Sequence, residues 1–313
     1  MSTQHSLLER TWPPQRIRVR SERLELRLPV EAEVLEIVDR ASRPGAVHDP
    51  DDMPFAGPWT DGEPAMIRQR GYQWHAQQRA NWEPDRWTLL LAAFVDGEPV
   101  GAQDIGATDF RLRREVGSGS WLLRSMQGGG LGTEMRELML HLAFEGLGAL
   151  AANSSAYLDN PASQRVSAKS GYAPNGVAAV VRSRGAHAPG GELQERAMEQ
   201  LFRIERGAWM PRRRDDIELA GLDDEVLAMF GRDRTETPRM RRPRLRPGRA
   251  ASGIGRFRTA VVAVRMDGDR APHGRGALQH DKERLPCASM QPPPPTRSIP
   301  ASSPPSSVSS RST

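Results

Sequence analysis

Apolar and polar positions along the chain follow two periods, one typical of helices and the other of strands. Apolar residues recur at helical spacing over 30–42 and 131–146, and a further helix is predicted over 63–80. Apolar-rich runs predict strands over 18–28 (one strand or a pair), 87–95, 100–107, 113–123, 149–158, 177–182 and 198–205. The dipeptide Asp96-Gly97 is a hairpin-turn signal between two of these runs. The mixture predicts an α/β fold.

Other segments lack such a pattern. Residues 1–14 are predicted to be a loose leader, and they lack the apolar core of a secretory signal. Residues 43–60 are rich in proline, glycine and aspartate and are predicted to be a long loop, while 184–192 is predicted to be an insertion. The run 198–205 is predicted to be the last strand, followed by a short helical closing segment over 212–231.

The chain changes character after Arg232. Residues 233–313 hold 12 of the 26 prolines and end in a stretch of Ser, Pro and Thr. Such a segment buries too little apolar surface to offset chain entropy. A folded domain is therefore predicted over 15–232 and a disordered Arg/Pro/Ser-rich tail over 233–313. The arginines would also suit an arm for nucleic acid or a membrane surface, but Phe257 is the single aromatic residue among them, so nucleic-acid binding is not expected.

Charge and cysteine content narrow the setting. The net charge is +5, but residues 233–313 hold 16 basic and 6 acidic residues, which leaves 28 basic and 33 acidic residues before them. The predicted domain is therefore mildly acidic. The only cysteine, Cys287, excludes an internal disulfide and a cysteine-based zinc site. No apolar run reaches the roughly 18–20 residues of a membrane span. A cytoplasmic setting is the default expectation.

One glycine-rich stretch, Gln127-Gly128-Gly129-Gly130-Leu131-Gly132-Thr133, separates a strand-like run from the helix predicted to begin at Leu131. Its glycines allow a tight turn and a close approach of the backbone to a ligand. The amides at the start of a helix have no internal partner and attract anions. The stretch therefore predicts a phosphate or pyrophosphate site, although a glycine-rich turn without a ligand remains the simpler alternative.

The residues of this loop distinguish between the protein families that bind phosphate groups with a glycine-rich loop. A Walker loop requires a lysine before Thr133, and a dinucleotide fingerprint requires glycine at that position. The loop instead reads Q-x-x-G-x-G, which resembles the coenzyme A pyrophosphate loop of the GNAT acyltransferases. The run from Asp159 to Tyr172 resembles their second signature, N-x-x-S-x-x-V-x-x-K-x-G-F/Y, in the right order and at the usual separation. A wider similarity, over about 15–232, is to the branch that includes the RimJ/RimL-like ribosomal-protein N-acetyltransferases.

The resemblance implies a single GNAT-like domain with a mixed, mostly antiparallel sheet flanked by helices. It implies transfer of an acetyl group from acetyl-CoA, without a metal, to a primary amine such as a peptide N-terminus or a small-molecule amine. A homodimer is left open. The implied contacts to coenzyme A are Trp121, Leu122, Leu123, the loop residues Gln127, Gly128, Gly129, Gly130, Leu131, Gly132 and Thr133, and Asn160 and Ser163. Two alternatives stand beside this reading: a non-catalytic acyl-CoA-binding module, and an acyltransferase for another donor such as succinyl-CoA.

The reaction needs a group that removes a proton from the amine, because amines are protonated at neutral pH. Glu115, at the start of the strand before the loop, is the first candidate for this base. Asp104, on the neighbouring strand, is the second. In many GNAT enzymes the general acid is a tyrosine at the position where this chain has Ser167. Ser167 or Ser163 is therefore a candidate to hold a water molecule or the sulfur of the thioester.

Overall fold

The computed structural model describes residues 5–49, 52–183 and 194–232, all of which lie within one compact unit of the chain, Met1–Met266. The predicted insertion at 184–192 and the predicted tail lie outside the described residues. The strands are β1 (Arg18–Arg20), β2 (Glu25–Arg27), β3 (Arg86–Val95), β4 (Glu98–Thr108), β5 (Glu115–Gly117), β6 (Ser120–Leu122), β7 (Ala151–Tyr157), β8 (Ala173–Ser183), β9 (Gln194–Glu205) and β10 (Glu218–Ala220).

The helices alternate with these strands. The α-helices are α1 (Leu7–Thr11), α2 (Glu31–Ser42), α3 (Pro64–Ala80), α4 (Phe110–Arg113), α5 (Leu131–His141), α6 (Pro161–Lys169), α7 (Arg206–Trp209) and α8 (Asp224–Met229). The short 3₁₀ segments are η1 (Pro13–Arg16), η2 (Arg124–Met126) and η4 (Met210–Arg212), and a π-helical segment, η3 (Leu142–Gly146), continues α5.

The described strands form one mixed sheet in the order β10-β1-β2-β3-β4-β5-β7-β9-β8, with β6 paired to β4 beside that path. Its pairings are antiparallel except that of β5 with β7. The predicted α/β fold with a mostly antiparallel sheet is therefore confirmed. The predicted turn is also present, since Asp96 and Gly97 have φ angles of 50° and 83°, as a two-residue hairpin turn requires.

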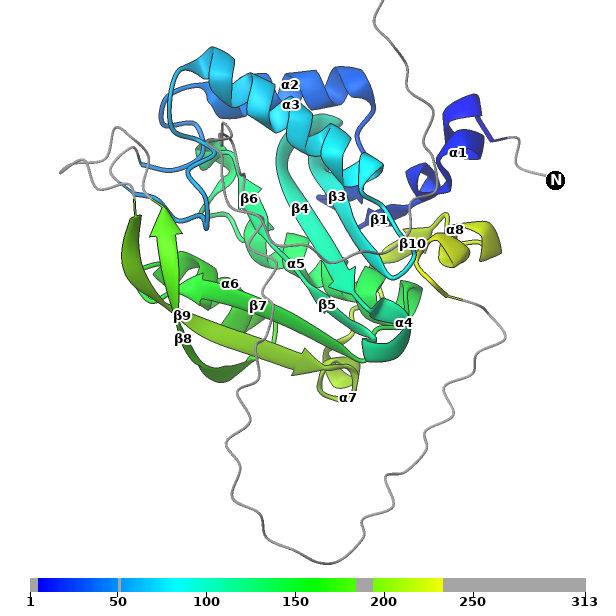
Figure 1. Ribbon diagram of the computed structural model, residues 1–313. Coiled ribbons are helices and arrows are strands. Elements are labelled where there is room, and N and C mark those ends of the chain that lie inside the picture. Colours follow the sequence, from blue (N-terminus) through cyan, green and yellow to red (C-terminus); the bar gives the residue numbers. More distant parts are fainter. Residues whose placement is uncertain (1–4, 50–51, 184–193, 233–313) are drawn as a thin grey trace, which may run out of the picture. The chain divides into compact units, whose positions relative to one another are not determined.

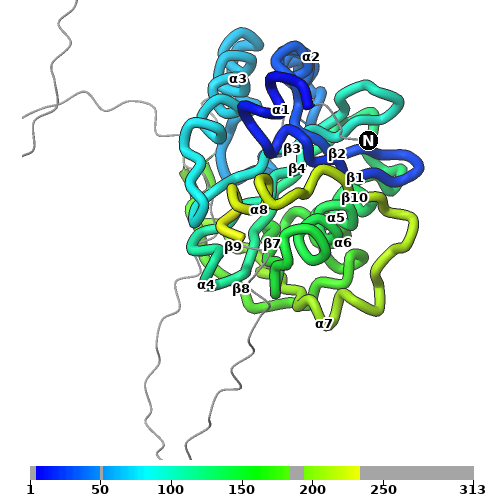
Figure 2. Tube along the Cα trace, turned by 90° about the vertical axis from the view of Figure 1, so that its right-hand side faces the viewer, coloured from blue at the N-terminus to red at the C-terminus, as the bar shows by residue number. Residues whose placement is uncertain are grey.

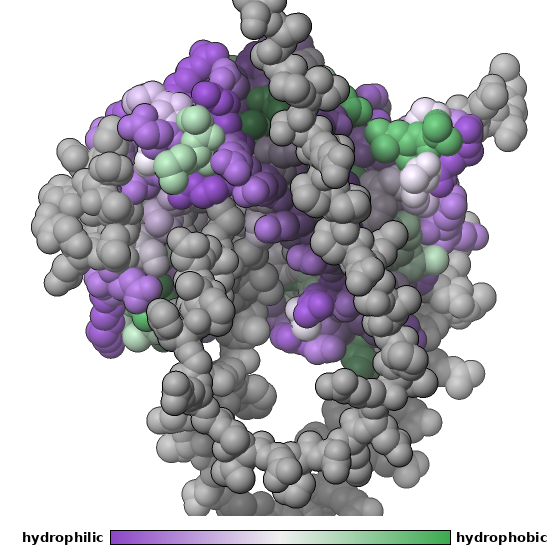
Figure 3. Space-filling model, turned by 45° about the horizontal axis from the view of Figure 1, so that its top comes forward, coloured by the Kyte–Doolittle hydropathy of each residue, from purple (hydrophilic) through white to green (hydrophobic). Residues whose placement is uncertain are grey.

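Helices cover both faces of the sheet (Figures 1 and 2). α2 and α3 lie over β4 and β3, and α5 lies on the opposite face against β1, β2, β4 and β6. α5 buries Met135, Leu138 and Met139, which recur at helical spacing as the apolar pattern predicts. On the face seen in Figure 3, hydrophilic side chains predominate over α2 and α3. Leu35 of α2 and Met66 of α3 are exposed hydrophobic residues, and exposed apolar side chains of this kind are ordinary on a protein surface.

The sheet opens beside the glycine-rich loop. β5 pairs with β7, but β6, only three residues further along, pairs with β4 instead. Gly119 marks the divergence: its carbonyl accepts from the Asp104 amide at 2.9 Å, and its amide donates to Asp104 Oδ1 at 2.6 Å. The predicted strand over 113–123 is thus two short strands. Figure 1 shows β6 staying with β4 while β7 runs away from it.

Two predictions at the ends of the fold are wrong, and a third is confirmed only in part. From Ser6 onward the expected leader is structured: Ser6 and Glu9 form a capping box for α1, and Pro13 and Pro14 are buried in η1. The strand over 198–205 is not the last, because β10 pairs with β1. The expected closing helix is accordingly reduced to α8. None of the helices in the described ranges has the length and apolar character that a bilayer crossing requires.

Candidate active site

The glycine-rich loop connects η2 to α5. Gly128 and Gly130 have φ angles of 83° and 87°, a region that other residues rarely adopt. Gly130 is the N-cap of α5, and the amides of Thr133 and Glu134 both return to its carbonyl at 3.1 Å. A Cβ on Gly128 or Gly129 would meet no atom within 4 Å. The loop therefore leaves open space over its backbone, where the amides that begin the helix are available to an anion.

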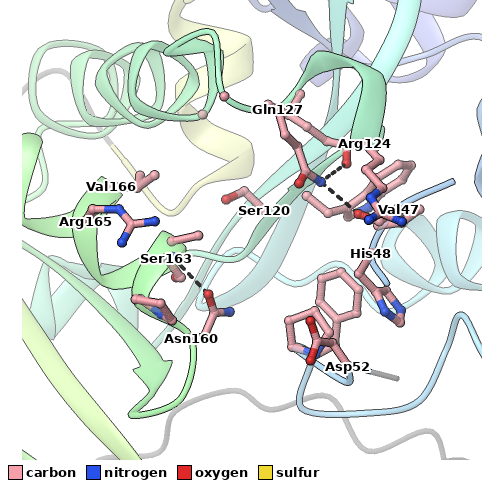
Figure 4. A pocket seen from close by; sticks show the side chains of 18 of the residues that line it. Val47, His48, Asp52, Ser120, Arg124, Gln127, Asn160, Ser163, Arg165 and Val166 are labelled. Atoms are coloured by element: carbon pink, nitrogen blue, oxygen red, sulfur yellow. Dashed lines mark hydrogen bonds between the residues drawn. The ribbon is translucent and has the colours of Figure 1, made fainter. Parts of the chain in front are cut away.

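The side chain of Gln127 fixes one wall of this site. Its Nε2 donates to Val47 O at 2.8 Å and to Leu122 O at 2.9 Å, which ties the 43–60 loop to the end of β6 (Figure 4). The Arg124 amide also donates to Ala46 O at 2.7 Å. Sequence reasoning assigned Gln127 to coenzyme A directly, whereas its amide here holds two backbone segments together.

A large cavity of about 840 Å³ lies between this wall and α6. Its lining includes nine of the predicted coenzyme residues: Trp121, Leu122, Gln127, Gly128, Gly130, Gly132, Thr133, Asn160 and Ser163. Leu123, Gly129 and Leu131 are not part of the lining. Cationic side chains that were not predicted also line it, among them Arg124, Arg165 and Lys169. Figure 4 shows Arg124 and Arg165 on opposite sides of the cavity.

A small cavity of about 300 Å³ lies on the other side of the opening in the sheet. Side chains from β4, β5, β7 and β9 line it, together with Phe55 and Trp74. The two cavities have six lining residues in common: Pro54, Phe55, Ser120, Arg136, Asn160 and Ser163. They therefore meet where β6 and β7 diverge, and a long molecule in the large cavity could present its end to the small one.

Asp104 lines the small cavity from β4. Its Oδ1 accepts the Gly119 amide at 2.6 Å. Burial raises the pKa of Asp104 to about 6, against smaller lowering effects of the Gly119 hydrogen bond and the charge of Arg136. A carboxylate with a pKa of this size is ionised at neutral pH and still accepts a proton readily, which suits a general base.

Glu115 also lines the small cavity, but it is engaged by other side chains. Its carboxylate lies 2.9 Å from Arg203, 3.3 Å from Arg113 and 3.4 Å from Asn153 Nδ2. The hydrogen bond from Arg203 lowers the pKa of Glu115 below its ordinary value. A lowered pKa weakens a carboxylate as a base, so these contacts favour a structural part for Glu115.

The serines of the second signature differ in their placement. Asn160 Oδ1 accepts the Ser163 amide at 3.0 Å and caps α6, so both residues stand where the cavities meet (Figure 4). Ser167 is 0% exposed and belongs to neither cavity lining, and its hydroxyl has no hydrogen-bond partner among the described residues. It lies behind the site, where it cannot touch a ligand in either cavity as the structure stands.

Two further residues of the site were missed from the sequence. Tyr157 lines the small cavity at the end of β7, and burial raises its pKa to about 12. Asn153, Ser155 and Tyr157 are two residues apart on one strand, so their side chains share a face of the sheet. This spacing is the sequence signal that could have identified Tyr157. Arg136 lines both cavities from α5. Its spacing from the buried residues Leu140 and Ala143, four and seven positions further along, indicated a position on the buried side of this helix.

The fold and the site define a transferase. Residues 23–173, which include Asp104, the glycine-rich loop and α6, match the family model of the acetyltransferase (GNAT) domain. This segment is a GNAT acetyltransferase domain, and the chain is an enzyme that transfers acetyl groups.

Solved structures similar to this chain include three acetyltransferases. RimJ of Mycobacterium smegmatis, in complex with a CoA disulfide, has 19% sequence identity, with 62% of this chain and 88% of that chain covered and a TM-score of 0.42. RimL, a ribosomal L7/L12 α-N-protein acetyltransferase in complex with coenzyme A, has 18% identity, 59% and 95% coverage and a TM-score of 0.41. The microcin C7 self-immunity acetyltransferase MccE, in complex with acetyl-CoA and AMP, has 14% identity, 59% and 93% coverage and a TM-score of 0.44.

Proposed function

We propose that this enzyme transfers the acetyl group of acetyl-CoA to a primary amine, with coenzyme A in the large cavity and the amine in the small one. The observation that carries the proposal is the meeting of the two cavities at the divergence of β6 and β7, with an anion site at one end and Asp104 at the other. A long donor and a compact acceptor would enter from separate sides and meet at that point.

Coenzyme A has features that suit the large cavity. Its pyrophosphate would bind the free amides of the glycine-rich loop, where the start of α5 also contributes a partial positive charge. Arg165 and Lys169 form no ion pair within the described ranges, so their charges are available to phosphate groups. The volume of about 840 Å³ lies within the roughly 300–1,000 Å³ range of small-molecule sites.

Asp104 would act as the general base. An amine that enters as an ammonium group gives one proton to the Asp104 carboxylate, and its nitrogen then attacks the thioester carbon. The carbon–sulfur bond breaks, and the second amine proton neutralises the departing thiolate. Asp104 suits this step better than Glu115, because burial raises its pKa whereas Arg203 lowers that of Glu115.

Release of the coenzyme A thiol from acetyl-CoA in the presence of single amines tests the proposal. The panel comprises a peptide N-terminus, a lysine-type amine, a polyamine and an amino acid amide. At least one amine is expected to raise thiol release well above the rate without acceptor. Tight binding of acetyl-CoA with no amine-dependent release from a broad panel would refute the assignment of the acceptor.

A further inference from the structure

Arg136 is a buried cation without an anionic partner. It is 2% exposed on α5, and its Nη1 donates to the neutral hydroxyl of Ser154 at 2.8 Å. Its Nε is buried with no partner in the described part of the chain. The guanidinium also lies 5.6 Å from the centre of the Tyr172 ring. A hydroxyl and a ring compensate only part of the desolvation of a full charge.

The other two buried arginines of the described segments show the usual arrangement. Arg16, 7% exposed, lies 2.8 Å from Asp223 and 2.7 Å from Glu225. Arg182, 8% exposed, lies 2.7 Å from both Asp159 and Glu195. Each of them faces two carboxylates, whereas none of the described carboxylates lies within 4.0 Å of a nitrogen of Arg136.

The position of Arg136 indicates where an anion would come from. It is one of the six residues that line both cavities, so it stands where donor and acceptor would meet. The charge of Arg136 acts on Asp104 only from a longer distance and lowers its pKa slightly, whereas burial of Asp104 has the larger, opposite effect. Arginine is always protonated, and its planar fork binds carboxylates through two parallel hydrogen bonds.

We propose that Arg136 binds a carboxylate carried by one of the two substrates at the junction of the cavities. The carboxylate belongs either to an amino-acid-like acceptor in the small cavity or to a dicarboxylic acyl group on the donor. The first source fits a compact cavity that also holds a proton-accepting carboxylate for the amine. The second would make the enzyme faster with a donor such as succinyl-CoA. The inference rests on the proposed function for which molecule occupies which cavity.

The test compares two matched pairs of substrates in the full-length chain and in Arg136→Met. The acceptor pair is L-phenylalanine and L-phenylalaninamide with acetyl-CoA, and the donor pair is succinyl-CoA and acetyl-CoA with one neutral amine. In one pair, the substitution is expected to lower kcat/KM for the carboxylate-bearing member about 10- to 100-fold more than for its neutral counterpart, the range for a hydrogen bond to a charged group. Comparing each substrate with itself across the variants cancels differences in amine reactivity.

Arg16→Met is the matched control, because Arg16 is also buried but lines neither cavity. It is expected to keep the substrate preferences of the parent. Arg136→Lys, which keeps the charge but loses the fork, is expected to give an intermediate loss and serves if Arg136→Met fails to fold. A selective loss in the acceptor pair or in the donor pair supports the proposal and identifies the source. Equal losses for both members of both pairs would overturn it and assign Arg136 to the reacting carbonyl or to structure.

A binding measurement separates this inference from the proposed function. The coenzyme A-bound protein is titrated in a calorimeter with N-acetyl-L-phenylalanine and with its amide, which represent the acceptor with and without a carboxylate. It is also titrated with succinate, which represents a dicarboxylic acyl group of the donor. If no amine is acetylated, the proposed function fails, but a preference for a carboxylate ligand that Arg136→Met abolishes still supports the inference. Indifference to the carboxylate in both titration and turnover contradicts it.

Discussion

Replacing Asp104 by asparagine tests its role as the general base through two measurements, kcat and the free energy of unfolding, which are expected to change in opposite directions. Asparagine keeps an oxygen that can accept the Gly119 amide, which lies 2.6 Å from Asp104 Oδ1, but it cannot take a proton. A general base contributes about 10²- to 10⁴-fold, so kcat is expected to fall by that amount near neutral pH. Affinity for acetyl-CoA is expected to change little, because Asp104 lines the small cavity and not the large one.

The free energy of unfolding of Asp104→Asn is expected to rise, in contrast to kcat. The pKa of Asp104 is raised from 3.8 to about 6, so the folded chain holds this proton more tightly than the unfolded chain. The parent therefore loses stability as pH rises from about 4 to about 6, and the loss is constant above that. One pKa unit corresponds to about 1.4 kcal/mol, so the two-unit shift corresponds to at most about 3 kcal/mol. Asp104→Asn removes this penalty and should raise the free energy of unfolding by up to that amount above about pH 6, but not near about pH 4.

The assay follows denaturant unfolding and thiol release over the same pH series. The parent kcat should fall as pH drops below about 6, since Asp104 is then protonated. The catalytic deficit of Asp104→Asn should shrink at high pH, where more of the amine is already neutral. Asp215→Asn, at an exposed site outside both cavities, is the control and should match the parent in turnover. Parent-like turnover of Asp104→Asn, or marked destabilisation at neutral pH, would refute the assignment.

Three further predictions concern the loop, Glu115 and the tail. Gly130→Asp adds a side chain and a negative charge at a φ of 87° and should abolish acetyl-CoA binding in calorimetry, whereas Gly57→Ala, in open space outside both cavities, should not; parent-like binding by Gly130→Asp would exclude the loop as the pyrophosphate site. Glu115→Gln breaks the ion pair with Arg203 and should lower turnover far less than Asp104→Asn; the reverse order would return the base role to Glu115. A chain ending at Arg232 should stay soluble and bind acetyl-CoA, because the composition of residues 233–313 predicts too little apolar surface to pack onto the domain; insoluble protein would contradict the proposed domain 15–232.

The elements that the sequence predicts well are those whose signals are local. The apolar period of α5, the Asp96-Gly97 turn and the glycines before Leu131 each depend on neighbouring residues. α4 was missed because it has four residues between Asp109 and Arg114, both left-handed with φ angles near 55° (55° and 54°), which nothing in their side chains requires. β10 was missed because its pairing partner, β1, is nearly two hundred residues away in the sequence.

The candidate site shows the same division. The glycine-rich loop could be located because the anion site proposed for it depends on contiguous backbone. The choice between Glu115 and Asp104 could not, since it depends on Arg203 meeting one carboxylate and on the burial of the other. The unpaired state of Arg136 likewise requires knowledge of every acid around it. Sequence patterns locate such side chains on an element, but their ionisation follows from tertiary neighbours.

Transfer of an isotopically labelled acetyl group tests the central claim most directly. The full-length chain is incubated with labelled acetyl-CoA and each amine of the panel, and the products are followed by mass spectrometry together with the free thiol. The structure predicts that one amine acquires the label on nitrogen, with one thiol released for each amide formed and both signals reduced in Asp104→Asn. Release of thiol with the label in free acetate alone, at the same rate with and without amine, would contradict it.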